Sequence, residues 1–282
     1  MTLGQGHFLT FGAGERRYVA AARRIRGEAG RSGLFQSLQI ADQDWVNDPK
    51  ICPEAVAILA KNCAQGFGLW AWKPHAIAHI LRKLPENAWL LYADGGCEFN
   101  PWLRGDDAVW SSLVDSIPLD SPLAFFHAGR VAQYTKLETL DYFDPERRTL
   151  EFPMAQANIL LFRANDATIE FVSEWAELCI VDGSRLLRDP LQVENEAQGF
   201  IAHRHDQSIL TQLLYERTVG PSLVPSEFGS GFFEWRRAGR HFPIWSSHNR
   251  RGMPLYSARG LHLPLAYLRH TRLRWKSSRH EK

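Results

Sequence analysis

The sequence has few cysteines, and their spacing is as informative as their number. The chain of 282 residues holds four cysteines, no two of them in a C-x-x-C pair, which excludes a dense disulfide framework and favours a reducing compartment. No segment approaches the ~20 consecutive apolar residues of a membrane helix. The first residues also lack the basic and apolar regions of a signal peptide. We therefore expect a cytoplasmic protein.

Several functional classes lack their usual marks. The formal net charge is only +2, and we expect no nucleic-acid partner, because a basic stripe rather than an overall balance would indicate one. The stretch "FGAGER" has two glycines after a strand-like segment but not the third glycine of a dinucleotide fingerprint. Neither a P-loop nor a G-x-S-x-G elbow is present.

What the chain does have is aromatic residues and an alternation of strand-like and helix-like segments. Ten tryptophans and 12% aromatic residues indicate stacking surfaces or a thick core. Alternating segments predict an α/β fold, with a mixed sheet flanked by helices and an irregular part from residue 221 onward. The expected strands are "HFLTF", "LFQSLQIA", "WLLYA", "PLAFFHA" and "QANILLFR", and the expected helices are "RRYVAAARRIRGEAG" with a basic outer face, "CPEAVAILAKNCA", "KPHAIAHILRKLP", "DATIEFVSEWAELCIV" and "HDQSILTQLLYERT".

An aspartate ends the most apolar of the expected strands. Asp94 follows "WLLYA" directly, and Glu98 comes four residues later, after the pair Gly95 and Gly96. Ligands of open α/β sheets bind beyond the carboxyl ends of the strands, and glycines let a ligand approach the backbone. The carboxylates suit Mg²⁺ or Mn²⁺. The alternative is that Asp94 only caps a tight turn.

A lysine and two tryptophans precede another expected helix. Lys73 stands directly before Pro74, so that its charge and a helix N-terminus could both bind a phosphate. Trp70 and Trp72 would share one face of an extended chain, as a stacking platform does. The alternative is two core tryptophans beside a solvated lysine.

Two histidine-containing segments lie further along the chain. "AHRHDQSIL" places His203 and His205 before Asp206, which is a good N-cap residue. A zinc site at the two histidines has no third ligand at a recognised spacing. His248 follows the apolar stretch "PIW", with Arg250 beside it; a lone histidine is more often structural than a ligand.

Five segments in order, "GFGLWAWKP", "LLYADGGCEFN", "PMAQANILLFR", "HRHDQSIL" and "PIWSSHNR", resemble the motifs of bacterial nucleotide-sugar glycosyltransferases of the A-type (GT-A) fold, particularly those that extend surface polysaccharides. The likeness runs from about residue 66 to 251. It implies a Rossmann-like fold, a nucleotide-diphosphate sugar as donor, often UDP-linked, and a divalent metal, Mn²⁺ or Mg²⁺, on the diphosphate.

The resemblance also implies roles for single residues. Asp94 takes the place of an Asp-x-Asp motif whose second aspartate this sequence lacks, so that Glu98 or a water would supply the lost ligand, and His248 matches a histidine that completes the metal site. Asp206 and Gln207 resemble an Asp-Gln pair facing the reacting carbon. Donor-binding residues would be Phe11, Trp72, Lys73, Asp94, Gln156, Asn158 and Arg250.

The implied organisation is one glycosyltransferase domain over residues 1–282. Residues 1–100 would form the nucleotide-binding half, residues 101–260 the half for donor sugar and acceptor, and residues 261–282 a basic tail. The acceptor would be a glycan or a lipid-linked glycan, and the tail could touch an anionic membrane weakly. Two alternatives stay open: a sugar nucleotidyltransferase, and a catalytically silent nucleotide-sugar-binding module of the same fold.

Overall fold

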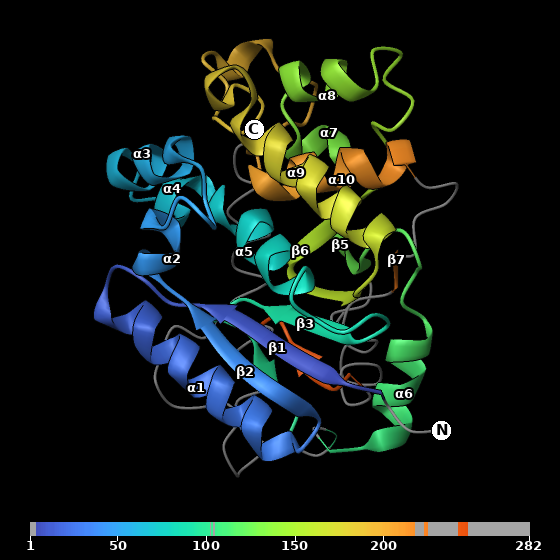
Figure 1. Cartoon of the computed structure of the whole chain (residues 1–282). Coiled ribbons are helices and arrows are strands. Elements are labelled where there is room, and N and C mark those ends of the chain that lie inside the picture. Colours follow the sequence, from blue (N-terminus) through green and yellow to red (C-terminus); the bar gives the residue numbers. More distant parts are fainter. Residues whose placement is uncertain (1–3, 102, 104, 218–222, 225–241, 248–282) are drawn as a thin grey trace.

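The computed structural model describes residues 4–101, 103, 105–217, 223–224 and 242–247. These residues form an α/β structure with a mixed sheet between two layers of helices (Figure 1). The expected fold class is therefore confirmed. His248, Arg250 and the basic tail lie outside the described residues, as does most of the part expected to be irregular.

The main sheet has six strands in the order β2-β1-β3-β6-β5-β7. Strand β1 pairs in parallel with β2 and β3, β6 is antiparallel to both β3 and β5, and β7 is parallel to β5. Strands β4 and β8 form a separate antiparallel pair. The strands are β1 (Gly6–Phe11), β2 (Phe35–Ala41), β3 (Trp89–Ala93), β4 (Glu98–Phe99), β5 (Leu123–Arg130), β6 (Pro153–Arg163), β7 (Leu223–Val224) and β8 (Ile244–Trp245).

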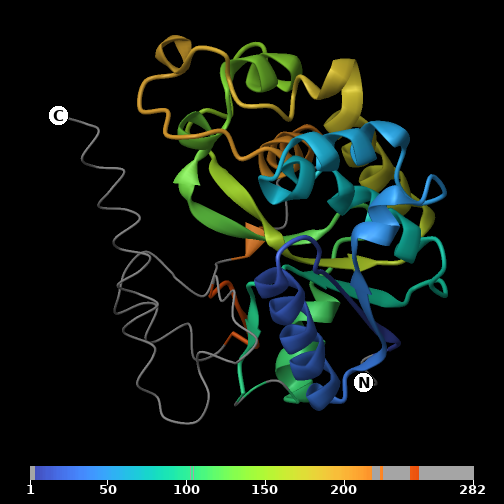
Figure 2. The same cartoon turned by 90° about the vertical axis from the view of Figure 1, so that its left-hand side faces the viewer.

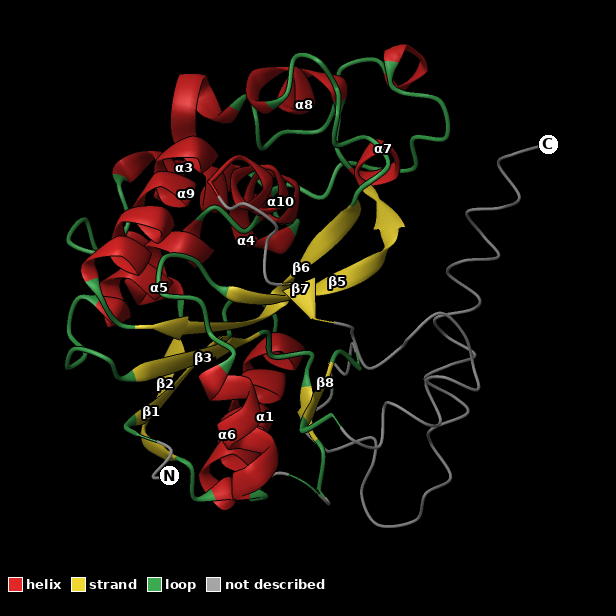
Figure 3. Cartoon of the chain, turned by 90° about the vertical axis from the view of Figure 1, so that its right-hand side faces the viewer, coloured by secondary structure: helices red, strands yellow, loops and turns green. Residues whose placement is uncertain are grey.

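Helices cover both faces of the sheet. On one side lie α1 and α6, and on the other α5, α9 and α10, as the views from the two sides show (Figures 2 and 3). The helices are α1 (Arg16–Ser32), α2 (Gln43–Asn47), α3 (Glu54–Asn62), α4 (Gly66–Leu69), α5 (Trp72–Leu81), α6 (Asp107–Asp115), α7 (Val131–Tyr134), α8 (Leu137–Phe143), α9 (Asp166–Ser184) and α10 (Asp206–Arg217), with a 3₁₀ turn at Val193–Asn195.

Strand β3 lies at the centre of the sheet and explains why its sequence is continuously apolar. Trp89, Leu91 and Ala93 point into the core beneath α1 and α6, whereas Leu90 and Tyr92 point into the core beneath α5, α9 and α10. A strand buried on both faces has no position for a polar side chain. Asp94, at the first position beyond the strand, is consequently the first charged residue.

The sheet brings separate parts of the chain together at the edge formed by the carboxyl ends of β1 and β3. The parallel strands β1 and β3 end at this edge, and β6 runs the opposite way, so that Ala93 at the end of β3 pairs with Ile159 inside β6. The first half of β6 therefore extends beyond the end of β3. Because β3 and β6 are neighbours, residues on either side of position 100 share one continuous sheet.

The five longer strands and five longer helices expected from the sequence are present, with α5 starting at Trp72 rather than at Pro74. The basic residues of α1 were expected on its outer face. This prediction is wrong for Arg24, which is buried against Glu28. Helix α6, which is as long as α3, and the short elements α2, α4, α7, α8 and β4 were not expected. Among the described residues, no helix is both long and apolar enough to cross a membrane.

Candidate functional site

A buried lysine joins three segments at the edge where β1 and β3 end. The Nζ atom of Lys73, in the first turn of α5, lies 2.7 Å from Asp206 Oδ2 and 3.7 Å from Asp94 Oδ1. It also donates a hydrogen bond of 3.0 Å to the carbonyl of Ala157 on β6. Lys73 is 2% exposed, so its ammonium is held by protein oxygens inside the molecule. Lys73 was expected to contact phosphates, but in this structure its ammonium contacts two carboxylates and a backbone carbonyl.

The electrostatics of this group are set by burial and by opposite charge. Burial raises the pKa of Asp206 to about 6, even though Lys73 acts to lower it. Burial alone would lower the pKa of Lys73, but Asp206 and Asp94 outweigh it and the pKa is raised. Asp206 can thus gain or lose a proton near neutral pH, as a general acid or base must.

Asp94 has a different environment from Asp206. Its side chain is 32% exposed, and its Oδ1 atom accepts a hydrogen bond of 2.5 Å from the hydroxyl of Tyr92. Burial, followed by the charge of Asp94, raises the pKa of Tyr92 well above its usual value, so the phenol stays protonated as the donor. Asp94 is therefore the member of the group that remains accessible to a ligand.

Arg24 on α1 holds the turn after Asp94 in place through hydrogen bonds. One guanidinium nitrogen of Arg24 donates to the carbonyls of Gly95 and Cys97, each at 2.8 Å. Its other nitrogen lies 2.8 Å from Glu28 and 3.6 Å from Glu98. Glu98 is 1% exposed and serves as a counter-ion of Arg24. Glu98 was expected as a substitute metal ligand, but the structure gives it this buried partner instead, because its strand, β4, packs on α1.

The aromatic residues near the end of β1 pack on one another. Phe11 stacks on Trp72 with ring centroids 3.6 Å apart and planes 16° apart, and Trp72 donates from Nε1 to the carbonyl of Gly66 at 3.0 Å. Trp72 is 2% exposed, which makes it part of the core. Phe11 is half-buried, so of this pair it is the one that can meet a ligand.

The two tryptophans do not form the shared face that an extended chain would give. Residues 66–70 all have φ between 54° and 90°, so the chain makes a left-handed turn that ends at Trp70, just before the helix that contains Trp72. Left-handed backbone costs about 1–2 kcal/mol for each residue other than glycine, and Phe67, Leu69 and Trp70 are three such residues. The expected platform of Trp70 and Trp72 is wrong because glycines at 66 and 68 permit this turn.

Two polar residues of β6 extend the site. Asn158 accepts a hydrogen bond from the backbone N–H of Asp94 through its carbonyl at 2.9 Å, and its amide donates to the hydroxyl of Ser246. Its Oδ1 atom is buried and has no hydrogen-bond partner among the described residues. Gln156, 6% exposed, donates to the carbonyl of Phe126 at 3.2 Å. Asn158 therefore holds the backbone of Asp94 and keeps a buried side-chain acceptor, whereas the amide nitrogen of Gln156 is already bound.

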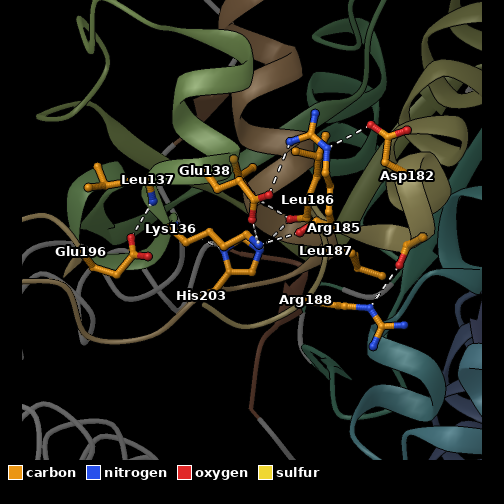
Figure 4. Close-up of polar contacts among 12 residues, drawn as sticks. Lys136, Leu137, Glu138, Asp182, Arg185, Leu186, Leu187, Arg188, Glu196 and His203 are labelled. Atoms are coloured by element: carbon orange, nitrogen blue, oxygen red, sulfur yellow. Dashed lines mark hydrogen bonds and ion pairs between the residues drawn. The ribbon is translucent and has the colours of Figure 1, made fainter. Parts of the chain in front are cut away.

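The histidines before α10 bind backbone carbonyls, as Figure 4 shows for His203. His203 donates from Nε2 to Leu186 at 2.9 Å, and His205 donates from Nδ1 to Leu187 at 2.8 Å. Burial and the neighbouring His205 lower the pKa of His203 to about 3. The alternative of a zinc site is therefore wrong, since both rings serve as structural hydrogen-bond partners. Gln207 is half-buried at the start of α10.

The predicted metal site is only partly within the described residues. Among these residues, no three His, Cys, Asp or Glu side chains are grouped so that they could hold a metal ion. Asp94 is at the site, Glu98 is paired with Arg24, and His248 lies outside the described residues, as does Arg250. The donor set described here does not by itself fit a divalent cation, and metal binding stays a prediction.

Sequence reasoning missed the contacts of four residues at the site. Tyr92 was read only as a strand residue, although a phenol two positions before a strand-ending aspartate can reach its carboxylate. Arg24 and Glu28 are four residues apart on α1, and this spacing is a sign of a pair. The carbonyl of Ala157 has no side-chain signal at all.

Comparisons with known proteins give likenesses of structure alone. No family model matches the chain, and no curated protein matches it. The chain is similar to mouse xyloside xylosyltransferase 1 in its apo form, with 12% identity, a TM-score of 0.46, and coverage of 89% of this chain and 100% of that chain. It is also similar to a glycosyltransferase involved in glycosylation of the major capsid of PBCV-1, with 11% identity, a TM-score of 0.41, and coverage of 85% and 92%. These likenesses concern the path of the backbone, and the chemistry rests on the side chains described above.

Proposed function

We propose that this protein is a glycosyltransferase that moves a sugar from a nucleotide-diphosphate donor to a glycan or lipid-linked acceptor, in the synthesis of a surface polysaccharide. The observation that carries the proposal is the convergence of the five segments that resemble glycosyltransferase motifs. Lys73 contacts Asp94 and Asp206, Asn158 contacts the backbone of Asp94, and its side chain contacts Ser246. Segments from five parts of the chain thus form one site.

The reaction suits these groups. Breaking the bond between sugar and phosphate creates positive charge at the anomeric carbon and negative charge on the leaving diphosphate. Asp206 is a buried carboxylate that titrates near neutral pH, and it can stabilise the developing positive charge or move a proton. Lys73 holds Asp206 in one orientation through the ion pair of 2.7 Å. Gln207, next in the chain, would lie beside the sugar.

The donor would lie across the ends of β1 and β3. The half-buried Phe11 would contact the base or ribose, and the turn after Asp94 would face the diphosphate. Glycine at position 95 lets this turn pack closely on α1, because a Cβ atom there would lie 3.2 Å from the backbone nitrogen of Ala22. Positive charge for the diphosphate would come from Arg250 or from a metal, both of which stay predictions.

A binding experiment and an activity experiment test the proposal together. Thermal-shift measurements with a panel of nucleotides and nucleotide sugars, with and without Mn²⁺, identify the donor, and calorimetric titration of UDP then compares wild type with Asp94→Asn and Asp206→Asn. We expect Asp94→Asn to weaken UDP binding, and Asp206→Asn to bind UDP while sugar transfer falls by about a hundredfold or more.

Asp115→Asn is a matched control, since it removes one exposed carboxylate from α6, on the opposite face of the sheet. It should bind UDP and transfer sugar like wild type. If no nucleotide raises the melting temperature, the proposal is wrong. Binding without any transfer to glycan or lipid-linked acceptors would favour a silent binding module, and formation of nucleotide sugar from sugar phosphate would favour a nucleotidyltransferase.

A further inference from the structure

His205 contacts two separate parts of the chain, the segment of Leu187 and the turn over residues 65–70. Its Nδ1 atom donates to the carbonyl of Leu187, so in the neutral ring Nε2 carries no proton and accepts from the amide of Gln65 at 2.9 Å. The ring also stacks on Trp70, with centroids 5.7 Å apart and planes 28° apart. His205 is 2% exposed, and these contacts surround it on several sides.

Both partners of the central ion pair are adjacent to these contacts. Asp206 directly follows His205. Trp70 is the last residue of the left-handed turn, and Lys73 comes three residues after it. The ring of Trp70 also packs closely on the backbone of its own turn, because a Cβ atom on Gly66 would lie 2.3 Å from it. Trp70 therefore links this turn to His205, and a shift of the turn would change the contact with His205.

The backbone of His205 adds a second constraint. Its φ is 49°, in the left-handed region that is strained for a residue with a side chain. Such a conformation persists where surrounding contacts hold it, and the contacts to Leu187, Gln65 and Trp70 do so here. The turn at His205 sets the direction in which α10 begins, and therefore the direction of the Asp206 carboxylate.

We infer that His205 is a positioning residue: through Gln65 and Trp70 it joins the turn that leads to Lys73 to the helix that begins with Asp206, and so sets the geometry of this ion pair. The inference rests on the proposed function where it concerns turnover, and on the structure alone where it concerns the ion pair.

His203 provides a matched comparison two residues earlier. It is equally buried, at 3% exposed, and it also donates to a backbone carbonyl, that of Leu186. Its Nδ1 atom accepts from the backbone N–H of Lys136 at 3.3 Å, so its second contact is with the start of α8 (Figure 4). The ring of His203 packs edge-on against that of His205, with centroids 5.5 Å apart, but its hydrogen bonds are to Leu186 and Lys136 and not to the 65–70 turn.

Asparagine substitutions separate the two roles. An asparagine side chain can replace the Nδ1 atom of either histidine but not Nε2. His205→Asn therefore keeps the bond to Leu187, tolerates positive φ, and loses Gln65 and Trp70; His203→Asn keeps Lys136 and loses Leu186. Gln65→Leu removes the same contact as His205→Asn from an exposed position on the other segment.

The first measurement is steady-state sugar transfer by full-length protein at a temperature where all variants are folded. A misplacement of catalytic groups by a fraction of an ångström lowers turnover, so we expect His205→Asn and Gln65→Leu to lower kcat by about tenfold with donor KM within about twofold. His203→Asn should lower the melting temperature but leave kcat within about twofold.

The second measurement does not depend on activity. The carboxyl carbon of Asp206, assigned by comparison with Asp206→Asn, is titrated by NMR in protein labelled at aspartate. Because Lys73 opposes the effect of burial on this carboxylate, a looser ion pair raises its titration midpoint. His205 itself also acts to lower the pKa of Asp206, so Gln65→Leu, which keeps the histidine, is the deciding variant. We expect an upward shift in His205→Asn and Gln65→Leu and the wild-type midpoint in His203→Asn.

Equal midpoints in all four proteins would overturn the inference, whatever the activities. A loss of kcat in His203→Asn as large as in His205→Asn would also overturn it, because burial alone would then explain the effect. If wild type transfers no sugar while the midpoint shifts as expected, the positioning role stands and the proposed function fails.

Discussion

Replacing Lys73 by methionine tests whether Asp206 is a buried carboxylate whose charge depends on this lysine. Methionine fills a similar volume without charge and leaves the Asp206 carboxylate inside the protein. Asp94, with a side chain that is 32% exposed, stays in contact with solvent and contributes little. The effect on stability therefore comes chiefly from Asp206, and it depends on pH.

The direction in which the free energy of unfolding changes with pH follows from the direction of the pKa shift of Asp206. The pKa of Asp206 is about 6 in the folded protein against 3.8 for an ordinary aspartate, so the folded state binds the proton more tightly than the unfolded state. A contribution of this kind is fully present below the unfolded pKa and is lost as pH rises through the folded pKa. In wild type, the loss between about pH 4 and pH 7 is about 3 kcal/mol, at about 1.4 kcal/mol per pH unit.

Without Lys73, the folded pKa of Asp206 rises further and the loss continues to higher pH. If Asp206 stays neutral up to about pH 7.5, the loss reaches about 5 kcal/mol, which is about 2 kcal/mol more than in wild type. At about pH 5, Asp206 is protonated in both folded proteins. We therefore expect Lys73→Met to lose about 2 kcal/mol more unfolding free energy at pH 7.5 than at pH 5.

Urea unfolding of wild type, Lys73→Met and Lys73→Met with Asp206→Asn, at the two pH values, measures this difference. The double variant has no carboxylate at position 206, so its stability relative to wild type should not show the extra loss at the higher pH. An equal loss for Lys73→Met at both pH values, or the same extra loss in the double variant, would refute the burial and pairing of Asp206 described here.

Three further changes have defined outcomes. Arg24→Met should lower the unfolding free energy by about 3–5 kcal/mol, because it leaves Glu28 and Glu98 buried beside each other; adding Glu28→Gln should recover part of this in urea unfolding. Gly66→Ala should lower the melting temperature far more than Gly33→Ala: both glycines have positive φ, but only at Gly66 would a Cβ meet the Trp70 ring at 2.3 Å, whereas nothing lies within 4 Å at Gly33. Removal of residues 269–282 should reduce co-sedimentation with anionic vesicles at low salt, and unchanged co-sedimentation would contradict weak membrane contact by the tail.

The sequence by itself determined the class of fold and indicated where the candidate site lies. Apolar patterning in "WLLYA" and in the helices is a local property of the chain, since a strand buried on both faces needs apolar residues at each position. Asp94 was predicted as a site residue because it directly follows an apolar strand, whereas Asp206 was predicted because it resembles the Asp-Gln pair of glycosyltransferases. Both lie at the edge of the sheet that the pattern indicated, and each of them contacts Lys73.

Only the tertiary structure decided what each charged residue contacts. Glu98 and Arg24 are 74 positions apart, and only the packing of β4 on α1 makes them an ion pair. Lys73 follows a left-handed turn that buries it, whereas its sequence context favoured an exposed position at a helix start. From the sequence, His205 was considered as a zinc ligand or as a structural histidine, yet its ring connects Gln65 to the start of α10. Contacts between residues far apart in sequence depend on how the elements pack, and no local pattern encodes them.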